Sequence, residues 1–359
     1  MSPPAPDSPG AFARRVLIVL SLAAVALALW RLRIIVLMVF IAILLAVFLR
    51  LLADPIARRT GLPGPIAVLL ALALLIASLM GLGALIGGEL QEQLRDLALR
   101  IPAVLRQLTG LLRDAGLPID AQGLLDSGSI EAVALQAAGA AQTLLQITAQ
   151  TIVVLFGALF LALQPRLYVD GLLALFPPGQ RAKAEEYLLL TGGALKQWLL
   201  GQLTSMLIIG VLVSVALMVI GLPGALALGV LTAVAEFVPY VGAISAGLVA
   251  TLVALSVSPE TALITFLAYL VVQQLEGNLI TPLVMRRAVR LAPALNVFAL
   301  ASLAAVFGPA GVFVAVPFAV TATVAVKFFW LRLALNEETN IPGQPVGRRR
   351  AGARNAQRQ

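Results

Sequence analysis

The sequence contains no cysteine and no histidine among its 359 residues. Without cysteine the chain offers no disulfide and no thiolate nucleophile. Without histidine it lacks the usual ligand of zinc and copper and the side chain that titrates near neutral pH. Hydrolysis by a serine–histidine pair is thereby excluded, and no glycine-rich phosphate loop with an adjoining lysine is present. The sequence predicts a protein that is not an enzyme and binds no cofactor or metal, in which proton-linked steps use carboxyl groups.

Charge is also scarce: charged residues make up 12% of the chain, hydrophobic residues 60%, and the mean hydropathy is +1.01. This composition is typical of an integral membrane protein, and no alternation of the kind found in barrel strands is present. The apolar runs cover residues 16–30, 34–53, 65–88, 143–163, 199–220 and 261–275. The net charge of +8 comes from bases at the ends of runs and in the tail, which fits anionic lipid better than nucleic acid. An all-α, polytopic transmembrane fold is predicted.

Two further apolar segments are broken near the middle by proline and glycine, at residues 236–242 and 307–311. Broken backbone is tolerated in a membrane only where protein encloses it, so these breaks predict helical hairpins over residues 224–256 and 295–330. Only with both hairpins does the basic cluster Arg286, Arg287 and Arg290 share the cytoplasmic side with the basic tail. The two hairpins then enter from opposite faces, and whether their arms cross fully is left open. Hinges are expected at Gly221, Pro223, Gly308, Gly311 and Pro317.

The runs and their flanks divide the chain into five regions. Residues 1–13 are expected to be disordered, and residues 14–165 to form scaffold spans with an extracytoplasmic amphipathic insert at 89–140. A cytoplasmic amphipathic segment follows at 166–198, then a transport core at 199–330, and finally a basic, disordered cytoplasmic tail at 331–359. Both termini are expected to be cytoplasmic.

Glu236 lies inside an apolar arm, where a charge costs about 2.5–3.5 kcal/mol on insertion scales. Three roles are open: a proton or cation site near the hairpin tip, an acceptor that caps free backbone donors there, and an interfacial residue wetted by cytoplasm. The tip residues Pro239, Tyr240 and Gly242 belong to the same candidate site.

A second polar cluster closes the run at 261–275. Its members are Gln273, Gln274, Glu276 and Asn278. Their oxygens and amides could bind a polar solute or a cation. Alternatively the cluster is an interfacial helix end, with Glu276 paired to Arg286 or Arg287. Gln202, at the start of the run at 199–220, is expected to serve helix association rather than ligand binding.

The sequence resembles the autoinducer-2 exporter family of bacterial membrane proteins, most densely between residues 172 and 326. The shared motifs are Leu-Leu-Gly-Gln at 199–202, Gly-Leu-Pro at 221–223, Phe-Val-Pro-Tyr-Val-Gly at 237–242, Gln-Leu-Glu-Gly-Asn at 274–278 with Pro282, and Phe-Gly-Pro-Ala-Gly at 307–311 before Pro317. The family commonly has histidine before the proline that opens the last hairpin, whereas this chain has Ala292 before Pro293. A mechanism that used that histidine would not transfer. The resemblance implies a homo-oligomeric transporter of the bacterial inner membrane.

The residues predict gradient-driven transport, and the resemblance implies that the transporter exports a small polar solute, such as an autoinducer-2-like signalling molecule or metabolite. A sodium/proton-type antiporter is the alternative, and a non-transporting membrane scaffold is the second alternative. The expected partners are that solute or a monovalent cation, membrane lipid and further copies of the chain.

Overall fold

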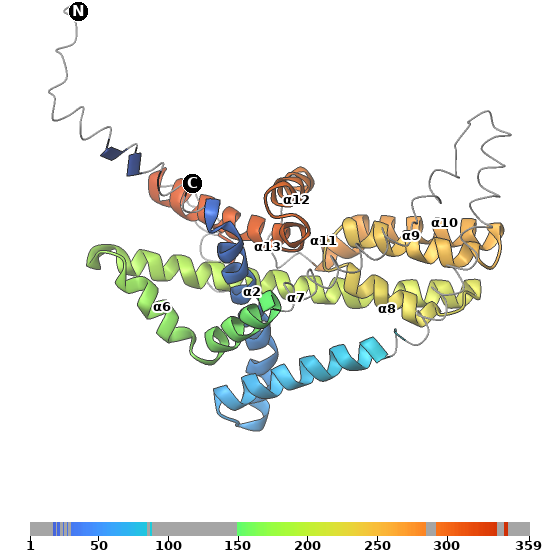
Figure 1. Ribbon diagram of the computed structural model, residues 1–359, viewed down its shortest axis with the longest axis horizontal. Helices are drawn as coiled ribbons and strands as arrows, with labels where there is room; N and C mark the ends of the chain where they lie inside the picture. The colour runs from blue at the N-terminus through green and yellow to red at the C-terminus, as the bar shows by residue number, and fades with distance from the viewer. Residues whose placement is uncertain are drawn as a thin grey trace, which may run out of the picture.

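The computed structural model describes residues 30–84, 149–284, 292–335 and 341–343, together with residue 87 and scattered positions among residues 17–27. Every regular element of these residues is a helix, which confirms the all-α fold. The α-helices are α2 (Arg33–Thr60), α6 (Pro165–Ala174), α7 (Arg181–Ile220), α8 (Ala225–Ala235), α9 (Val241–Leu255), α10 (Pro259–Leu275), α11 (Thr281–Val284), α12 (Pro293–Phe307) and α13 (Pro309–Ala325), as Figure 1 shows. The helices Gly64–Ala84 and Ala149–Leu163 lie between α2 and α6 in the chain. A 3₁₀ turn, Pro178–Gln180, precedes α7, and π-helical segments Glu276–Ile280 and Val326–Ala334 follow α10 and α13.

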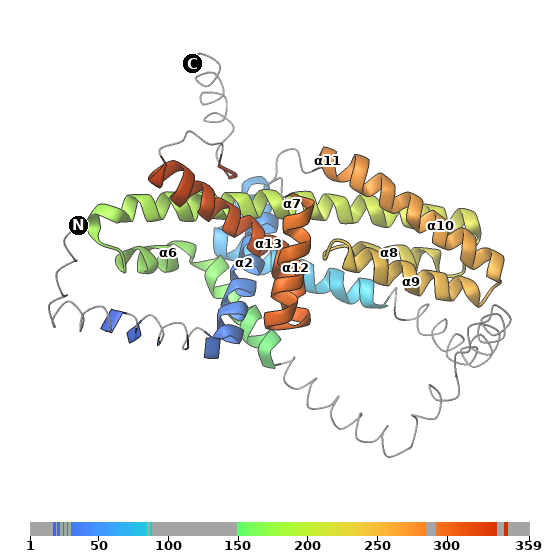
Figure 2. The same ribbon diagram turned by 90° about the horizontal axis from the view of Figure 1, so that it is seen from above.

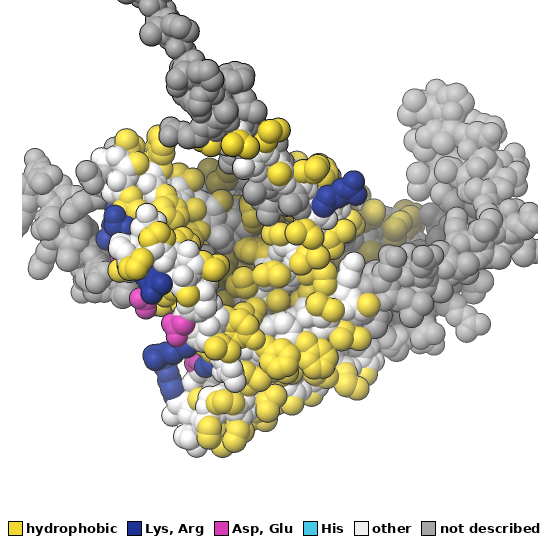
Figure 3. Space-filling model, turned by 60° about the vertical axis from the view of Figure 1, so that its left-hand side comes forward, with side chains coloured by type: hydrophobic (Ala, Val, Ile, Leu, Met, Phe, Trp, Pro, Cys, Tyr) yellow, Lys and Arg dark blue, Asp and Glu magenta, His cyan; other side chains and the backbone are white. Residues whose placement is uncertain are grey.

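Five described helical segments are long and apolar enough to cross a membrane. They are Arg33–Thr60, Gly64–Ala84, Pro178–Ile220, Pro259–Val284 and Pro309–Ala334. The helix Ala149–Leu163 and α6 meet at a 90° bend and make a sixth if the pair is one broken span. Hydrophobic side chains cover most of the described surface in Figure 3, as lipid contact requires. The predicted insert at 89–140 lies outside the described residues, as does most of the predicted span at 16–30.

The longest helix, α7, has 40 residues and extends for about 60 Å, roughly twice the thickness of a hydrocarbon core. It ends where Gly221 takes the left-handed conformation (φ 79°) and the Leu222 amide donates to the Leu217 carbonyl at 3.0 Å. This is a Schellman ending, which glycine favours because it has no Cβ. Figures 1 and 2 both show α8, α9 and α10 alongside the C-terminal half of α7.

The first hairpin consists of α8, a tip at residues 236–240, and α9, which matches the predicted segment at 224–256. With 11 residues, α8 is about 16 Å long and is too short to cross a hydrocarbon core of about 30 Å. The arms touch at the tip, because a Cβ on Gly242 would overlap the carbonyl oxygen of Ala235. Only glycine permits this backbone approach.

The second hairpin consists of α12 and α13, joined at Gly308, whose φ of 65° and ψ of −148° suit glycine alone. Here too the arms touch: a Cβ on Gly311 would overlap the carbonyl oxygen of Leu303. The two arms differ in length, since α12 has 15 residues whereas α13 and its π-helical extension run from Pro309 to Ala334 and are long enough to span. In this second hairpin only α12 is shorter than a membrane span. The sequence had left open whether the arms cross fully.

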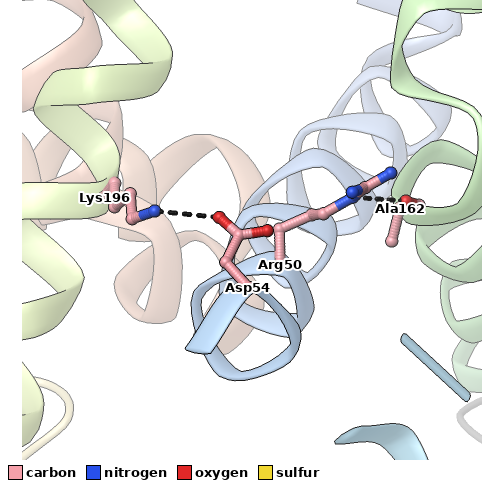
Figure 4. Close-up of polar contacts among 4 residues, drawn as sticks. All are labelled: Arg50, Asp54, Ala162 and Lys196. Carbon is pink, nitrogen blue, oxygen red and sulfur yellow. Dashed lines mark hydrogen bonds and ion pairs between the residues drawn. The ribbon is translucent and has the colours of Figure 1, made fainter. Parts of the chain in front are cut away.

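Polar contacts connect α2 to two neighbouring helices (Figure 4). The Arg50 Nε atom donates to the carbonyl oxygen of Ala162 at 2.6 Å, near the end of the helix Ala149–Leu163, where carbonyls lack partners within the helix. One turn further along α2, Asp54 Oδ2 accepts a hydrogen bond from Lys196 Nζ of α7 at 3.1 Å. These bonds give the charged side chains of Arg50, Asp54 and Lys196 polar partners. The bond to Lys196 also joins the predicted scaffold residues to α7.

The described part of the predicted disordered tail is folded. The π-helical segment continues through its beginning, where Arg332 Nη1 donates to Glu186 Oε1 of α7 at 2.8 Å. Further along, Ile341 is fully buried in the cluster that contains Trp198 and Phe328. Burying one isoleucine side chain contributes about 1.5–3 kcal/mol, which favours docking of this segment although the surrounding sequence is polar.

Candidate functional site

The two hairpins meet beside α7. The ring of Phe237, in the first tip, stacks on Phe313 of α13 with centroids 4.4 Å apart, and the Trp198 ring of α7 meets Phe237 edge-on at 5.9 Å. Such aromatic pairs contribute about 0.5–1.5 kcal/mol beyond the area that they bury. The two breaks in the apolar segments therefore pack together, and the residue that precedes Phe237 lies where both hairpins and α7 converge.

That residue is Glu236, which follows α8 directly and is fully buried, with 0% of its surface exposed. Its backbone carbonyl accepts a hydrogen bond from Gln202 Nε2 of α7 at 2.7 Å, which ties the tip to α7. Neither carboxyl oxygen accepts a hydrogen bond from any described residue. The described residues thus show no hydrogen bond of the kind that a backbone cap makes, and the buried side chain does not favour the interfacial role. The role as a proton or cation site stays a prediction.

Glu276 begins the π-helical turn that follows α10. The Thr281 amide donates to the Glu276 carbonyl five residues earlier, and such turns re-aim side chains and recur at functional sites. The side chain is 8% exposed, and its Oε2 atom accepts a hydrogen bond from Gln273 Nε2 at 2.7 Å. Arg286 and Arg287, the alternative partners, lie outside the described residues, so that ion pair stays a prediction.

The buried carboxyl groups of Glu236 and Glu276 are neighbours that interact electrostatically. Two ionised carboxylates offer acceptors and no donor, so a hydrogen bond between them requires a proton on one of the two. Burial makes two adjacent negative charges costly. The arrangement can therefore hold one shared proton, or a small cation in its place.

Tyr240, at the tip, is the one non-glycine residue with a positive φ among the described residues, at 68° with ψ −54°. The Val241 amide donates to the Pro239 carbonyl at 2.9 Å across it, which makes a classic γ-turn. This turn is rare and strained. Strain of this kind persists where packing enforces it and concentrates at functional sites.

Replacing Tyr240 with Gly is expected to stabilise the protein by about 1 kcal/mol, because glycine adopts the positive φ without strain. Little packing is lost, since the side chain is 44% exposed. Thermal unfolding of the purified protein in detergent measures the change. Tyr240→Ala is the matched control: it removes the ring and keeps the strain, so it should give no gain. A Gly variant less stable than the Ala variant would contradict the prediction.

The other predicted polar residues separate by face. Asn278 Nδ2 donates to Gln274 Oε1 at 3.1 Å, and both side chains are exposed, whereas Gln273 and Glu276 face inward. The predicted polar residues thus form two groups on different sides of one helix end, as the four-residue spacing of Gln274 and Asn278 indicates. The hinge candidates lie at helix ends, in the turn before α8 and within α13: Gly221, Pro223, Gly308, Gly311 and the buried Pro317. Their role as hinges stays a prediction.

Sequence reasoning missed one polar contact and underrated another. The Tyr269 hydroxyl of α10 and the Thr232 hydroxyl of α8 are 2.8 Å apart, one helical turn from Glu236. A spacing of four residues links Thr265, Tyr269 and Gln273 on α10, and this period was the available signal. Gln202, expected only to join helices, holds the backbone of Glu236.

Comparison with known proteins gives consistent findings. The sequence model described as "AI-2E family transporter" matches residues 17–330. Three relatives each carry the name putative transport protein: YueF and YrrI of Bacillus subtilis (strain 168) and MT0215 of Mycobacterium tuberculosis. The chain is 26% identical to YueF over 82% of its own length and 84% of that protein. It is 29% identical to YrrI over 40% of each chain, and 42% identical to MT0215 over 29% of each.

Proposed function

The chain belongs to the AI-2E transporter family, and from that membership we propose that it is a gradient-driven transporter in which the Glu236–Glu276 pair carries the coupling proton. The multi-pass helical fold and the family establish a membrane transporter. The observation that supports the finer proposal is the burial of two adjacent carboxyl groups with no hydrogen-bond donor for Glu236 among the described residues.

Coupling follows from where the two carboxyl groups are attached. Glu236 belongs to a hairpin tip and Glu276 to the π-helical turn after α10, so a displacement of the tip changes the separation of the two groups. Close together, the pair retains a proton. When the two carboxyl groups move apart, each loses the neighbouring negative charge that favours its protonated form, and the proton can leave. A transporter that alternates between two such arrangements moves a proton with every cycle, and the tip contact with Phe313 couples that movement to the second hairpin.

We assign as the transported species a small polar solute that leaves the cell, such as an autoinducer-2-like signalling molecule or a related metabolite. The family description favours a transporter of this class. Amide groups that could bind hydroxyls lie at the site, namely Gln202 beside the tip and Gln273 beside Glu276. The proposal places the protein in the bacterial inner membrane with cytoplasmic termini, as a homo-oligomer.

A sodium/proton-type antiporter is the second candidate. The specific observation in its favour is again the carboxyl pair, because it can exchange its shared proton for a monovalent cation. No third acidic residue among the described positions joins the pair, and a divalent cation generally requires more oxygen ligands than two carboxylates supply. A scaffold without transport is less favoured, because helix association needs no buried ionisable pair.

The proposal is tested with purified protein in liposomes that contain a pH-sensitive dye. On addition of the transported solute, or of sodium for the second candidate, the internal pH should change in liposomes that contain protein and stay constant in protein-free liposomes. An imposed pH gradient should in turn accelerate solute movement. If the solute flux is independent of the pH gradient and the internal pH does not change, the protein does not couple transport to protons.

A further inference from the structure

The inward face of α10 carries a polar side chain at each turn, beside the buried apolar residues Ala262 and Val272, whereas its outward face is apolar. The outward residues Leu263, Ile264, Phe266, Leu267, Leu270 and Val271 are each 48% to 60% exposed. The inward positions instead include Thr265, Tyr269 and Gln273, four residues apart, and they lead to Glu276. A membrane helix that turns its polar side chains inward generally borders a path for ions, protons or solute.

Thr265 shows that this face is more than helix packing. Its side chain is 0% exposed, and its hydroxyl has no hydrogen-bond partner among the described residues. A threonine hydroxyl in a helix usually bonds the carbonyl four residues earlier, as Thr232 does to Leu228 at 2.7 Å. A buried hydroxyl left without a partner costs about 1–3 kcal/mol unless water or a ligand satisfies it.

The next polar group along this face is Tyr269. The Thr232 hydroxyl donates its single hydrogen to the Leu228 carbonyl, so in its contact with Tyr269 it accepts, and the Tyr269 hydroxyl donates. The oxygen of Tyr269 retains acceptor capacity for water. Its ring covers Gly247 of α9, where an added Cβ would lie 3.1 Å from the ring, so α9 leaves room for it.

At the other end of the face, Ser258 caps the N-terminus of α10, and its hydroxyl lies 2.9 Å from that of Thr261, one turn before Thr265. Polar groups thus recur at each turn from the N-cap of α10 to the carboxyl pair. We propose that the inward face of α10, through Thr261, Thr265 and Tyr269, lines a water-filled path that connects the N-terminal end of α10 with the Glu236–Glu276 pair. This inference extends the proposed function by naming the route that the proton takes.

The absence of cysteine permits a direct test, because an introduced cysteine is the only thiol. Thr265→Cys is expected to react with a small, charged, water-soluble thiol reagent added to the reconstituted protein, although the position is fully buried here. Ala254→Cys, equally buried on α9 within an apolar cluster, is the matched control and should not react. Val257→Cys, which is 54% exposed just before α10, identifies the side from which the reagent enters.

Transport rates supply the second measurement. Thr265→Val and Tyr269→Phe should each lower the rate about fivefold, the factor that one hydrogen bond commonly makes. The controls Thr251→Val and Tyr168→Phe, which make the same chemical changes away from this face, should leave the rate unchanged. If Thr265→Cys is as unreactive as Ala254→Cys, the path does not exist. Proton coupling itself is judged separately by the liposome measurement, so labelling without coupling would refute the proposed function and leave the path standing.

Discussion

Glu236→Gln is expected to abolish proton-coupled transport while the protein still folds and inserts. The amide matches the carboxyl in shape and retains an acceptor, but it cannot release a proton. It also supplies a permanent donor toward Glu276, so the pair is fixed in the arrangement that resembles its proton-bound form. Loss of a proton-transfer group of this kind lowers rates about 100-fold or more. The dye-loaded liposomes described above measure both solute flux and internal pH.

Glu276→Gln should have the same effect, and the double variant should be no slower than either single one. Two groups that share one proton act as a unit, so their substitutions are not additive. Glu260→Gln, an exposed position in the first turn of α10, is the matched control and should transport normally. Normal pH dependence in Glu236→Gln would remove Glu236 from the coupling mechanism. Additive losses in the double variant would mean that the two carboxyl groups work independently.

Gly242→Leu should abolish transport without preventing insertion into the membrane. Even the first side-chain atom would overlap the carbonyl oxygen of Ala235, so the arms of the first hairpin must separate and Glu236 must move away from Glu276. Overpacking of this kind destabilises proteins by about 1–3 kcal/mol or more. The measurements are solute flux in liposomes and thermal unfolding in detergent.

The matched control for Gly242 is Gly192→Leu on α7, where nothing lies within 4 Å of an added Cβ. That variant should transport normally and be at least as stable as the original, since other residues exceed glycine in helix propensity. Gly311→Leu, which would overlap the Leu303 carbonyl in the second hairpin, should behave like Gly242→Leu. Full activity in Gly242→Leu would show that the tight tip is not needed for transport.

The sequence was sufficient for the helical segments and for the positions of the two breaks, because long apolar runs and clusters of proline and glycine act locally. The first hairpin, predicted at 224–256, is observed as α8, the tip and α9 within a residue or two. What was left open is the length of the arms, because the number of residues in an apolar run does not show that α8 ends at Ala235, before the tip that contains the strained turn at Tyr240.

The sequence predicted the tip with Glu236 and the polar cluster with Glu276 as two separate groups. It did not predict that the two groups are neighbours in the folded protein. Glu236 and Glu276 are 40 residues apart in the numbering, and no local pattern indicates that a tip and a helix end will converge. Glu276 lies two residues from both Gln274 and Asn278, so ordinary helical geometry already places it on the opposite side of the helix end, but that geometry does not say what it faces there. Gln202 was likewise undervalued, since a lone amide in an apolar helix usually only joins helices.

The docking of Ile341 against Trp198 and Phe328 bears on how this protein is to be engineered for study. A reporter or affinity tag fused directly after residue 335, where the last helix ends, would delete the isoleucine and leave a cavity against α7. Losing a buried side chain of that size costs about 2–5 kcal/mol. Fusions that begin after Gly343 keep the segment in place. If a truncation ends before Ile341, its effect reflects the lost stability of the protein and not only the loss of the basic residues.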